Sequence, residues 1–330
     1  MIEMIWKNVR VLVTGVTGFV GSHLARRLAE EGAVVVGLAH DSKPYSLFNL
    51  FGLDRKVSIV WGDLSNFSFE RVLAKYEIEY VFHLAAQAIV RHAYLSPLST
   101  FYSNIIGTCN LLEACRKIGN IKAILVPSTD KVYGEARGRI PLKEDYTLEA
   151  LGMYESSKAC ADLITRAYHT TYGIPVTVSR ACNIFGLDLN PRIIPNTIIK
   201  CLKGIQPVIF KRIESSREYI YIDDVLDAYL LLIEKIDLTK GKPYNVGTGF
   251  VLTQEDIVLK IISHFKDLQP KYEEPPPHME KEIQEELLSS ERISRIGWSP
   301  KVSIDHGLSK TIDDFNKYWH LLKHWPCTKR

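Results

Sequence analysis

The stretch Thr14-Gly15-Val16-Thr17-Gly18-Phe19-Val20-Gly21 follows a β-branched run at Val9 to Val13 and precedes a helical pattern from Ser22 to Glu31. A second apolar run, Ala33 to Leu38, completes a βαβ unit. Glycines in such a turn let backbone N–H groups and a helix N-terminus approach a pyrophosphate, because a Cβ would block the way. A plain structural turn is the alternative. The pattern predicts dinucleotide contacts from Gly15, Thr17, Gly18, Phe19, Val20 and Gly21.

The end of the second apolar run lacks the carboxylate that usually binds an adenosine ribose. The chain continues as Gly37-Leu38-Ala39-His40-Asp41, so Asp41 is the only nearby acid. A carboxylate that accepts the ribose hydroxyls favours NAD over NADP, and we assign Asp41 to the cofactor site on that ground. A solvated loop position is an equal alternative for Asp41, and His40 and Lys43 keep NADP open.

Strand-length apolar runs alternate with helical patterns through the first half of the chain. The runs lie at Val57 to Trp61, Glu79 to Leu84, Ile121 to Val126 and Val176 to Ser179, and one helical pattern spans Asn104 to Cys115. This alternation predicts an α/β fold with a doubly wound parallel sheet, whose ligands lie at the C-terminal ends of the strands. The candidates for cofactor contact in this part are Asp63, Leu64, Leu84, Ala85, Ala86, Gln87 and Asn104.

Two further stretches carry groups that can move protons. Ser128-Thr129-Asp130-Lys131-Val132-Tyr133-Gly134 places a hydroxyl, a carboxylate and an amine directly after a predicted strand. Tyr154-Glu155-Ser156-Ser157-Lys158 begins a helical pattern in which the Tyr and the Lys share one face. A nearby ammonium lowers a tyrosine pKa from about 10 and suits the phenol to proton transfer near neutral pH. An ordinary helix with a surface Tyr and Lys is the alternative. The predicted catalytic residues are Thr129, Asp130, Lys131, Tyr154 and Lys158.

The composition is that of an ordinary globular protein. Of 330 residues, 46% are hydrophobic and 24% are charged, and 41 basic against 38 acidic residues leave a formal charge of +3. This balance does not argue for a nucleic-acid or membrane-surface partner. The six cysteines form no CxxC pair and no metal-ligand spacing, so we expect reduced thiols and no metal site. No apolar run reaches membrane-spanning length, and we expect a cytoplasmic protein.

Beyond about Arg180 the pattern is less regular, and basic residues stand among prolines. Arg192 and Arg217 are candidates for binding a diphosphate, because guanidinium matches phosphate oxygens bidentately. Isolated arginines are more commonly surface residues. The run Tyr219 to Ile222 predicts a short strand that leads into a helix with an aspartate N-cap, at Asp223-Asp224.

The segments above resemble the nucleotide-sugar epimerase/dehydratase family of extended short-chain dehydrogenases/reductases. The matching segments run in the family's order: TGVTGFVG (14–21), HLAAQ (83–87), STDKVYG (128–134), YESSK (154–158), RACNIFG (180–186), RIIP (192–195), REYIYIDDV (217–225), YNVGTG (244–249) and IGWSP (296–300). The resemblance implies a Rossmann domain, residues 1–182 plus about 219–250, and a nucleotide-sugar-binding lobe, about 183–218 and 251–330. It also implies NAD, a nucleoside-diphosphate sugar and a homodimer. The substrate contacts implied are Asn183 and Arg217, with Arg91 as a weaker candidate.

Asp130 and Lys131 decide the subfamily. By resemblance, 4-epimerases need only the hydroxyl, the Tyr and the Lys, whereas 4,6-dehydratases add an acid and a base directly after the hydroxyl. Asp-Lys at these positions is similar to members that act on CDP-glucose and to inverting UDP-N-acetylglucosamine dehydratases. We therefore expect an NAD-dependent 4,6-dehydratase, with a 4-epimerase or, more distantly, a non-catalytic dinucleotide sensor as alternatives. The segment Pro277 to Lys281 lacks the Arg that many relatives use near the nucleotide, which leaves the nucleotide base open.

The resemblance also implies a mechanism. Tyr154 takes the C4 hydroxyl proton as hydride leaves C4 for NAD+, and Thr129 hydrogen-bonds the same oxygen. The resemblance also implies that Tyr154 and Lys158 contact the cofactor, with Lys158 bound to the nicotinamide ribose hydroxyls. Lys131 must be neutral to remove the C5 proton, and Asp130 must be protonated to release the C6 hydroxyl as water. A simple ion pair between Asp130 and Lys131 is the alternative.

Overall fold

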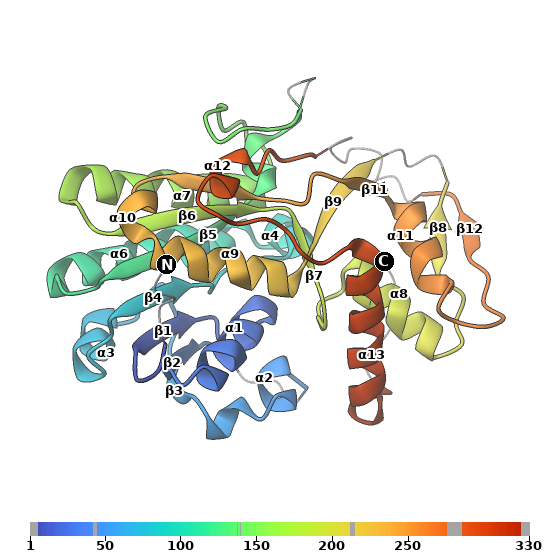
Figure 1. Ribbon diagram of the computed structural model, residues 1–330, viewed down its shortest axis with the longest axis horizontal. Coiled ribbons are helices and arrows are strands. Elements are labelled where there is room, and N and C mark those ends of the chain that lie inside the picture. Colours follow the sequence, from blue (N-terminus) through green and yellow to red (C-terminus); the bar gives the residue numbers. More distant parts are fainter. Residues whose placement is uncertain are drawn as a thin grey trace. The chain divides into compact units, whose positions relative to one another are not determined.

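The computed structural model describes residues 6–41, 45–136, 138, 140–211, 215–275 and 286–324 (Figure 1). Lys43, Cys327 and the segment from Pro277 to Lys281 therefore lie outside the described residues. The chain forms two compact units: the first is Met1–Gly134, Glu144–Ala181 and Leu226–Asn245, and the second is Glu135–Lys143, Cys182–Val225 and Val246–Arg330. Relative to the division expected from the sequence, residues 135–143, 182, 219–225 and 246–250 fall in the second unit.

The first unit is built on a seven-stranded sheet in the order β10-β6-β5-β4-β1-β2-β3. The strands are β1 (Arg10–Thr14), β2 (Val34–Ala39), β3 (Ser58–Trp61), β4 (Tyr80–His83), β5 (Ala123–Thr129), β6 (Val176–Ala181) and β10 (Pro243–Val246). The pairings from β3 across to β6 are all parallel, and the order reverses direction between β1 and β4. The structure thus confirms the predicted doubly wound α/β fold with a smaller second unit.

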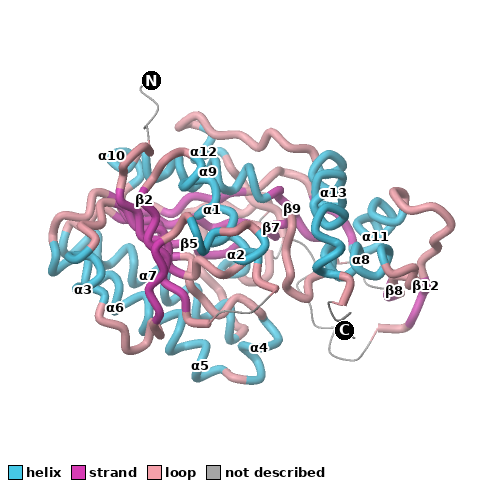
Figure 2. The backbone as a smooth tube through the Cα atoms, turned by 90° about the horizontal axis from the view of Figure 1, so that it is seen from below, coloured by secondary structure: helices cyan, strands magenta, loops and turns pink. Residues whose placement is uncertain are grey.

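Helices cover both faces of this sheet (Figure 2). On one face α3 (Phe69–Lys75), α6 (Gly107–Ile118) and α7 (Met153–Tyr172) pack against the buried aliphatic side chains of the strands. On the other face α1 (Phe19–Glu30) lies beside α9 (Ile222–Glu234), joined by an ion pair of 2.9 Å from Arg27 to Asp227. Strands buried on both sides explain the near-continuous apolar runs in the sequence.

The helix expected from Asn104 begins earlier than the sequence pattern indicates. The chain is already helical in α4 (Val90–Leu95) and α5 (Pro97–Phe101), passes through a π-helical turn at Tyr102–Ile106, and continues as α6. Short elements complete the first unit: α2 (Leu47–Leu50), the 3-10 turns Leu53–Arg55 and Asp130–Tyr133, and α10 (Ile236–Thr239).

The second unit contains two small sheets, in the orders β11-β9-β7 and β12-β8. Its elements are β7 (Asn183–Phe185), α8 (Ile193–Leu202), β8 (Val208–Phe210), β9 (Ser216–Tyr221), β11 (Val251–Thr253), α11 (Gln254–Ile262), β12 (Lys271–Glu273), α12 (Glu291–Ser294) and α13 (Ile304–Leu322). The aspartate N-cap expected for α9 is wrong, because the helix begins at Ile222 and both aspartates lie in its first turn. Asp224 instead accepts the backbone N–H groups of Lys301 and Val302, at 2.9 and 3.0 Å.

Candidate active site

The glycine turn between β1 and α1 is too compact for side chains. Gly15 has a φ of +68°, and a Cβ there would lie 2.7 Å from the Ala85 backbone. A Cβ on Gly21 would lie 2.1 Å from the Gly15 carbonyl oxygen. No side chain caps α1, whose N-cap is Gly18, so the N–H groups of its first turn are left for an incoming anion. Thr17, Phe19 and Val20 belong to the same turn, and the cradle fits a dinucleotide pyrophosphate.

The candidates for the adenosine end lie after β2 and β3. Asp41 and His40 are exposed, and His40 Nε2 lies 3.5 Å from an oxygen of Asp63. Asp63 also accepts the backbone N–H and the hydroxyl of Ser65, both at 2.8 Å, and these bonds hold its pKa below the ordinary value. Leu64, the next residue, is buried. The structure therefore places Asp63, rather than Asp41, in a defined hydrogen-bonded position.

A hydrogen-bonded chain fixes the end of β4, where the sequence marks Leu84 to Gln87. Thr108 donates to the Asn104 carbonyl at 2.7 Å, so its oxygen must accept from His83 Nε2 at 3.1 Å. His83 Nδ1 then accepts from the Thr14 hydroxyl at 2.9 Å, and Thr14 accepts the Ala85 N–H at 3.1 Å. Burial, together with the charge of Lys158, lowers the pKa of His83 to about 3. The imidazole is therefore a neutral spacer between β1, β4 and α6.

Asn104 extends this chain to the catalytic helix. Its Oδ1 accepts the Gln87 N–H at 2.7 Å, and its Nδ2 donates to the Gln87 carbonyl at 3.0 Å and to Ser157 Oγ at 2.8 Å. Ser157 donates in turn to the Tyr154 carbonyl at 2.7 Å. With its side-chain oxygen and nitrogen committed in this way, Asn104 orients the loop after β4 and the start of α7. Within the predicted site, Asn104 therefore connects Gln87 to Ser157 by hydrogen bonds.

The predicted hydroxyl, acid and amine meet at the end of β5. The Thr129 hydroxyl donates to Asp130 Oδ1 at 2.8 Å, and Lys131 Nζ donates to the same oxygen at 3.2 Å. Asp130 is 1% exposed, and its other oxygen, Oδ2, is buried without a hydrogen-bond partner among the described residues. A buried carboxyl oxygen with no partner is costly, so Oδ2 is the atom of this cluster with most to gain from a ligand.

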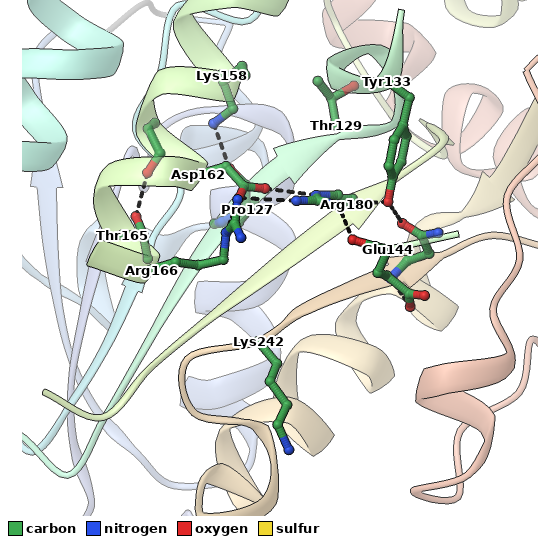
Figure 3. A network of polar contacts seen from close by, with 12 residues as sticks. Pro127, Thr129, Tyr133, Glu144, Lys158, Asp162, Thr165, Arg166, Arg180 and Lys242 are labelled. Carbon is green, nitrogen blue, oxygen red and sulfur yellow. Dashed lines mark hydrogen bonds and ion pairs between the residues drawn. The ribbon is translucent and has the colours of Figure 1, made fainter. Parts of the chain in front are cut away.

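Tyr154 and Lys158 lie one turn apart at the start of α7, as predicted. Lys158 is 8% exposed, and its Nζ donates to the Pro127 carbonyl at 2.5 Å (Figure 3). Burial lowers the pKa of Lys158 to about 8, although the charge of Asp162 opposes this shift. A buried lysine with a pKa this close to neutrality can gain or lose its proton with a small change in surroundings.

The Pro127 carbonyl is free for Lys158 because of strand pairing. Phe82 and Leu125 form the last pair between β4 and β5, so β5 continues past its neighbour on that side. Ile124 donates to Pro175 on the β6 side, at 2.8 Å, and alternation turns Pro127 toward the β4 side. The N–H that a proline lacks is not needed there, and the carbonyl on the same side receives the lysine instead. The sequence gives a signal for this, a proline inside a central strand.

The predicted diphosphate contacts belong to the second unit, apart from Arg91, which is exposed on α4. Asn183 donates to the Glu218 carbonyl at 3.1 Å. Arg192 Nε lies 3.7 Å from the buried Asp188 carboxylate, and Arg217 Nε lies 3.3 Å from Glu286. Each arginine is therefore paired with an acid, and Arg217 also donates to the Ser216 carbonyl at 2.9 Å.

Sequence reasoning missed the groups that hold the catalytic residues. Pro127 is marked only by being a proline inside a central strand, and the hydroxyls of Thr14, Thr108 and Ser157 belong to ordinary residue types without a motif of their own. Of the described residues, none form a cluster of His, Cys, Asp or Glu able to hold a metal ion. Nor does any helix in the described ranges have the length and apolar character to cross a membrane.

The fold is that of a dinucleotide-binding enzyme, with a Tyr/Lys pair one helical turn apart and a hydroxyl at a strand end. Residues 11–247 match the family model described as the NAD dependent epimerase/dehydratase family. The protein belongs to this family.

The similar proteins include both 4,6-dehydratases and 4-epimerases. The chain is 30% identical to the CDP-glucose 4,6-dehydratase of Salmonella typhimurium, over 98% of this chain and 95% of the relative. Among solved structures, the Thermotoga maritima UDP-glucose 4-epimerase with UDP-glucose matches with a TM-score of 0.86 and 29% identity, over 94% of this chain and 100% of that one. The Thermus thermophilus UDP-glucose 4-epimerase in complex with NAD matches with a TM-score of 0.83 and 27% identity, over 93% and 99%. Members of both reaction types are thus comparably similar.

Proposed function

We propose that the protein is an NAD-dependent nucleoside-diphosphate-hexose 4,6-dehydratase that forms a 4-keto-6-deoxy sugar nucleotide. The observation that carries this proposal is the Asp130–Lys131 pair, which stands next to Thr129 and leaves Asp130 Oδ2 buried with no hydrogen-bond partner in the part of the chain that the structure describes. A 4-epimerase requires no acid and base at this point. The similarity to a CDP-glucose 4,6-dehydratase along nearly the whole chain supports the same reaction type.

The cofactor site suits NAD, which would lie with its pyrophosphate on the α1 N-terminus and supply the hydride acceptor for C4 and the donor for C6. In the proposed reaction Tyr154 takes the proton of the C4 hydroxyl. Lys158 keeps the Tyr154 phenolate accessible through its positive charge, and Thr129 hydrogen-bonds the C4 oxygen. The free protein directs the Thr129 hydroxyl to Asp130, so substrate must redirect it.

The two remaining groups act on C5 and C6. Lys131, once deprotonated, removes the C5 proton that the 4-ketone makes acidic. Asp130, in its protonated form, gives its proton to the C6 hydroxyl, which leaves as water. Among the described residues, Oδ2 has no hydrogen-bond partner. A proton on this oxygen could therefore be donated to the C6 hydroxyl of the substrate when it binds. After water leaves, Lys131 is an ammonium and Asp130 a carboxylate, so this step regenerates their ion pair. Lys131 then returns a proton to C5 as C6 receives hydride.

The substrate proposed is a hexose linked to a nucleoside diphosphate, of the CDP-glucose, GDP-mannose or dTDP-glucose type. Asn183, Arg192 and Arg217 of the second unit are proposed to bind the sugar diphosphate, with Arg91 as a further basic contact. The ion pairs of Arg192 with Asp188 and of Arg217 with Glu286 support this, because they hold each guanidinium in place before a phosphate binds.

A UDP-glucose-type 4-epimerase is the second candidate. The observation in its favour is the distance of 3.2 Å between Lys131 and Asp130, at which the pair can stand as a simple ion pair with no role in proton transfer. The two epimerase structures named above agree with this reading. The two candidates differ in the mass of the product, since only dehydration removes water.

Mass spectrometry with NAD+ and a panel of CDP-, GDP-, UDP- and dTDP-hexoses tests the proposal. We expect loss of one water from one member of the panel. Lys131→Arg is the decisive variant, because it keeps the positive charge beside Asp130 while a guanidinium cannot serve as a base. Dehydration should fall by about 10²–10⁴-fold, with no deuterium incorporated at C5 in D2O and with cofactor binding unchanged. A product of unchanged mass, or full dehydration by Lys131→Arg, would contradict the proposal.

We further propose a homodimer and a cytoplasmic location. Apolar side chains are exposed along α4, α5, the π-helical turn and α7, elements that pack together in the first unit: Tyr94, Leu95, Leu98, Tyr102, Ile106 and Leu163. A second copy would cover this face, and a monomer in sedimentation velocity at micromolar concentration would contradict the dimer. The five described cysteines are free, which suits a reducing compartment. Fractionation of cells for the native protein checks the location.

A further inference from the structure

A buried arginine joins the two elements that carry the predicted catalytic residues. Arg180 lies on β6 opposite Ser128 of β5 and is 1% exposed. Its guanidinium reaches in two directions, toward the turn Asp130–Tyr133 and toward helix α7 (Figure 3). The turn carries Asp130 and Lys131, and the helix carries Tyr154 and Lys158.

On the side of the turn, Arg180 takes part in a closed ring of hydrogen bonds. Its Nη1 donates to the Tyr133 hydroxyl at 2.8 Å and to the Glu144 carbonyl at 3.1 Å. Tyr133 donates to Asn245 Oδ1 at 2.7 Å, and the Asn245 N–H returns to Glu144 Oε1 at 3.0 Å. Burial raises the pKa of Tyr133 to about 12, so its phenol keeps the proton that this ring needs.

On the side of the helix, Arg180 is held by Asp162, which is 0% exposed. Arg180 Nε donates to Asp162 Oδ2 at 2.8 Å, and Arg180 Nη2 donates to Asp162 Oδ1 at 3.2 Å. Asp162 lies one turn after Lys158 on α7, and it also accepts from Arg166 at 2.8 Å. The two-point contact fixes both the position and the rotation of the helix face that carries Lys158.

A contribution to stability does not by itself explain why the Arg180–Asp162 ion pair is buried. Burying a charged pair costs solvation free energy, and well-packed apolar side chains of similar volume commonly stabilise a core at least as well. What an apolar cluster cannot do is fix one register, because its contacts are not directional. A guanidinium with four hydrogen bonds in defined directions does so.

We propose that Arg180 is a positioning residue, which locks the turn after β5 to helix α7 so that Asp130 and Lys131 stay aligned with Tyr154 and Lys158. It acts through Tyr133 on one side and Asp162 on the other and does not contact the substrate. The proposal rests on the proposed function for the roles of these four residues. It predicts that cutting one arm of the clamp slows turnover more than it weakens binding.

The test cuts the arm to the turn with Tyr133→Phe, which keeps the ring packed at 5.0 Å from the guanidinium and removes only the hydroxyl. Tyr244→Phe is the matched control. Tyr244 is buried, it precedes Asn245 in the chain, and its hydroxyl donates to the Leu238 carbonyl at 3.4 Å. Tyr133→Phe should lower kcat about tenfold with KM changed less than about twofold, and a larger share of the enzyme should hold reduced nicotinamide during turnover. Tyr244→Phe should change neither kcat nor the share of enzyme that holds reduced nicotinamide, when the two variants are compared at equal thermal stability.

A second variant and a readout without turnover keep the outcomes distinct. Asp162→Asn, which weakens the other arm, should lower kcat in the same way. Amide hydrogen exchange of residues 128–134 should be faster in Tyr133→Phe than in Tyr244→Phe, whatever the substrate. Equal exchange, or equal kcat in the two tyrosine variants, overturns the clamp. If the wild type yields an isomer of unchanged mass, the proposed function fails, and the clamp is still tested by the kcat of that reaction and by exchange.

Discussion

Replacing Lys158 with Met should remove activity and yet stabilise the free protein at neutral pH. Burial lowers the pKa of Lys158 from its ordinary 10.5 to about 8. At about 1.4 kcal/mol for each tenfold change in proton affinity, the folded state carries a penalty of about 3 kcal/mol for holding the charged amine at pH 7. Methionine has a similar length and no charge. The variant loses the hydrogen bond to the Pro127 carbonyl, which lowers the free energy of unfolding by about 1–2 kcal/mol. We therefore expect the free energy of unfolding to rise by about 1–2 kcal/mol in total.

The pH dependence of this gain has a defined sign. Between the folded pKa of about 8 and the ordinary 10.5, the unfolded chain binds more protons at Lys158 than the folded protein does. The wild type therefore becomes more stable, through this group, as pH rises across that window. The advantage of Lys158→Met should be complete below pH 8 and should reverse at roughly pH 10.5, because a neutral amine still donates to Pro127.

Urea denaturation of the cofactor-free protein at pH 7 and roughly pH 10 measures both effects. Lys242→Met is the matched control, since Lys242 is exposed and its amine also donates to a backbone carbonyl, that of Leu238, at 3.2 Å. The control should change stability by less than about 0.5 kcal/mol at either pH. A Lys158→Met protein that is less stable than the wild type at pH 7, or whose gain does not shrink with pH, would refute the reasoning.

Two further predictions concern the cofactor side of the site. Gly21→Ala should weaken NAD binding at least about tenfold, because the added Cβ would lie 2.1 Å from the Gly15 carbonyl oxygen; unchanged affinity by calorimetry would show that the turn can adjust. His83 should remain neutral, with its proton on Nε2, down to roughly pH 4, because burial lowers its pKa to about 3. Nitrogen chemical shifts of the labelled imidazole check this, and a titration in the range of an exposed histidine would contradict the hydrogen-bonded chain through Thr14 and Thr108.

The strands of the sheet could be predicted because local sequence determines them, although β5 spans Ala123–Thr129 and not the expected Ile121 to Val126. Strands buried on both faces are apolar throughout, and a glycine turn such as Gly15 to Gly21 has few other uses between a strand and a helix. Tyr154 and Lys158 could be placed together because helical spacing fixes them on one face. The start of the helix near Asn104 was harder to predict from the sequence, because a π-helical turn shifts the register of the apolar positions.

The groups that hold the catalytic residues could not be predicted, because they join distant parts of the chain. Arg180 and Tyr133 are 47 residues apart, and Tyr133 and Asn245 are 112 apart. The Pro127 carbonyl depends on where β4 stops pairing with β5, and that end is a property of two strands together. A side chain of ordinary type, or a backbone carbonyl, acquires its role only when tertiary structure brings its partner.

The choice between dehydratase and epimerase depends on how the Asp130–Lys131 pair behaves when substrate arrives. At 3.2 Å the two groups stabilise each other in their charged forms, and these are the forms in which neither can do the proposed chemistry. The Thr129 hydroxyl is part of the same cluster, because it also donates to Asp130 Oδ1. A C4 oxygen that draws Thr129 away removes one of the two donors that favour the Asp130 carboxylate, and a C6 hydroxyl beside Oδ2 offers an acceptor for a proton. Both changes favour transfer of the proton from Lys131 to Asp130, which prepares the acid and the base in one step. For the dehydratase proposed above, the ion pair of the free protein would be the resting form, and binding of the sugar would start the proton transfer.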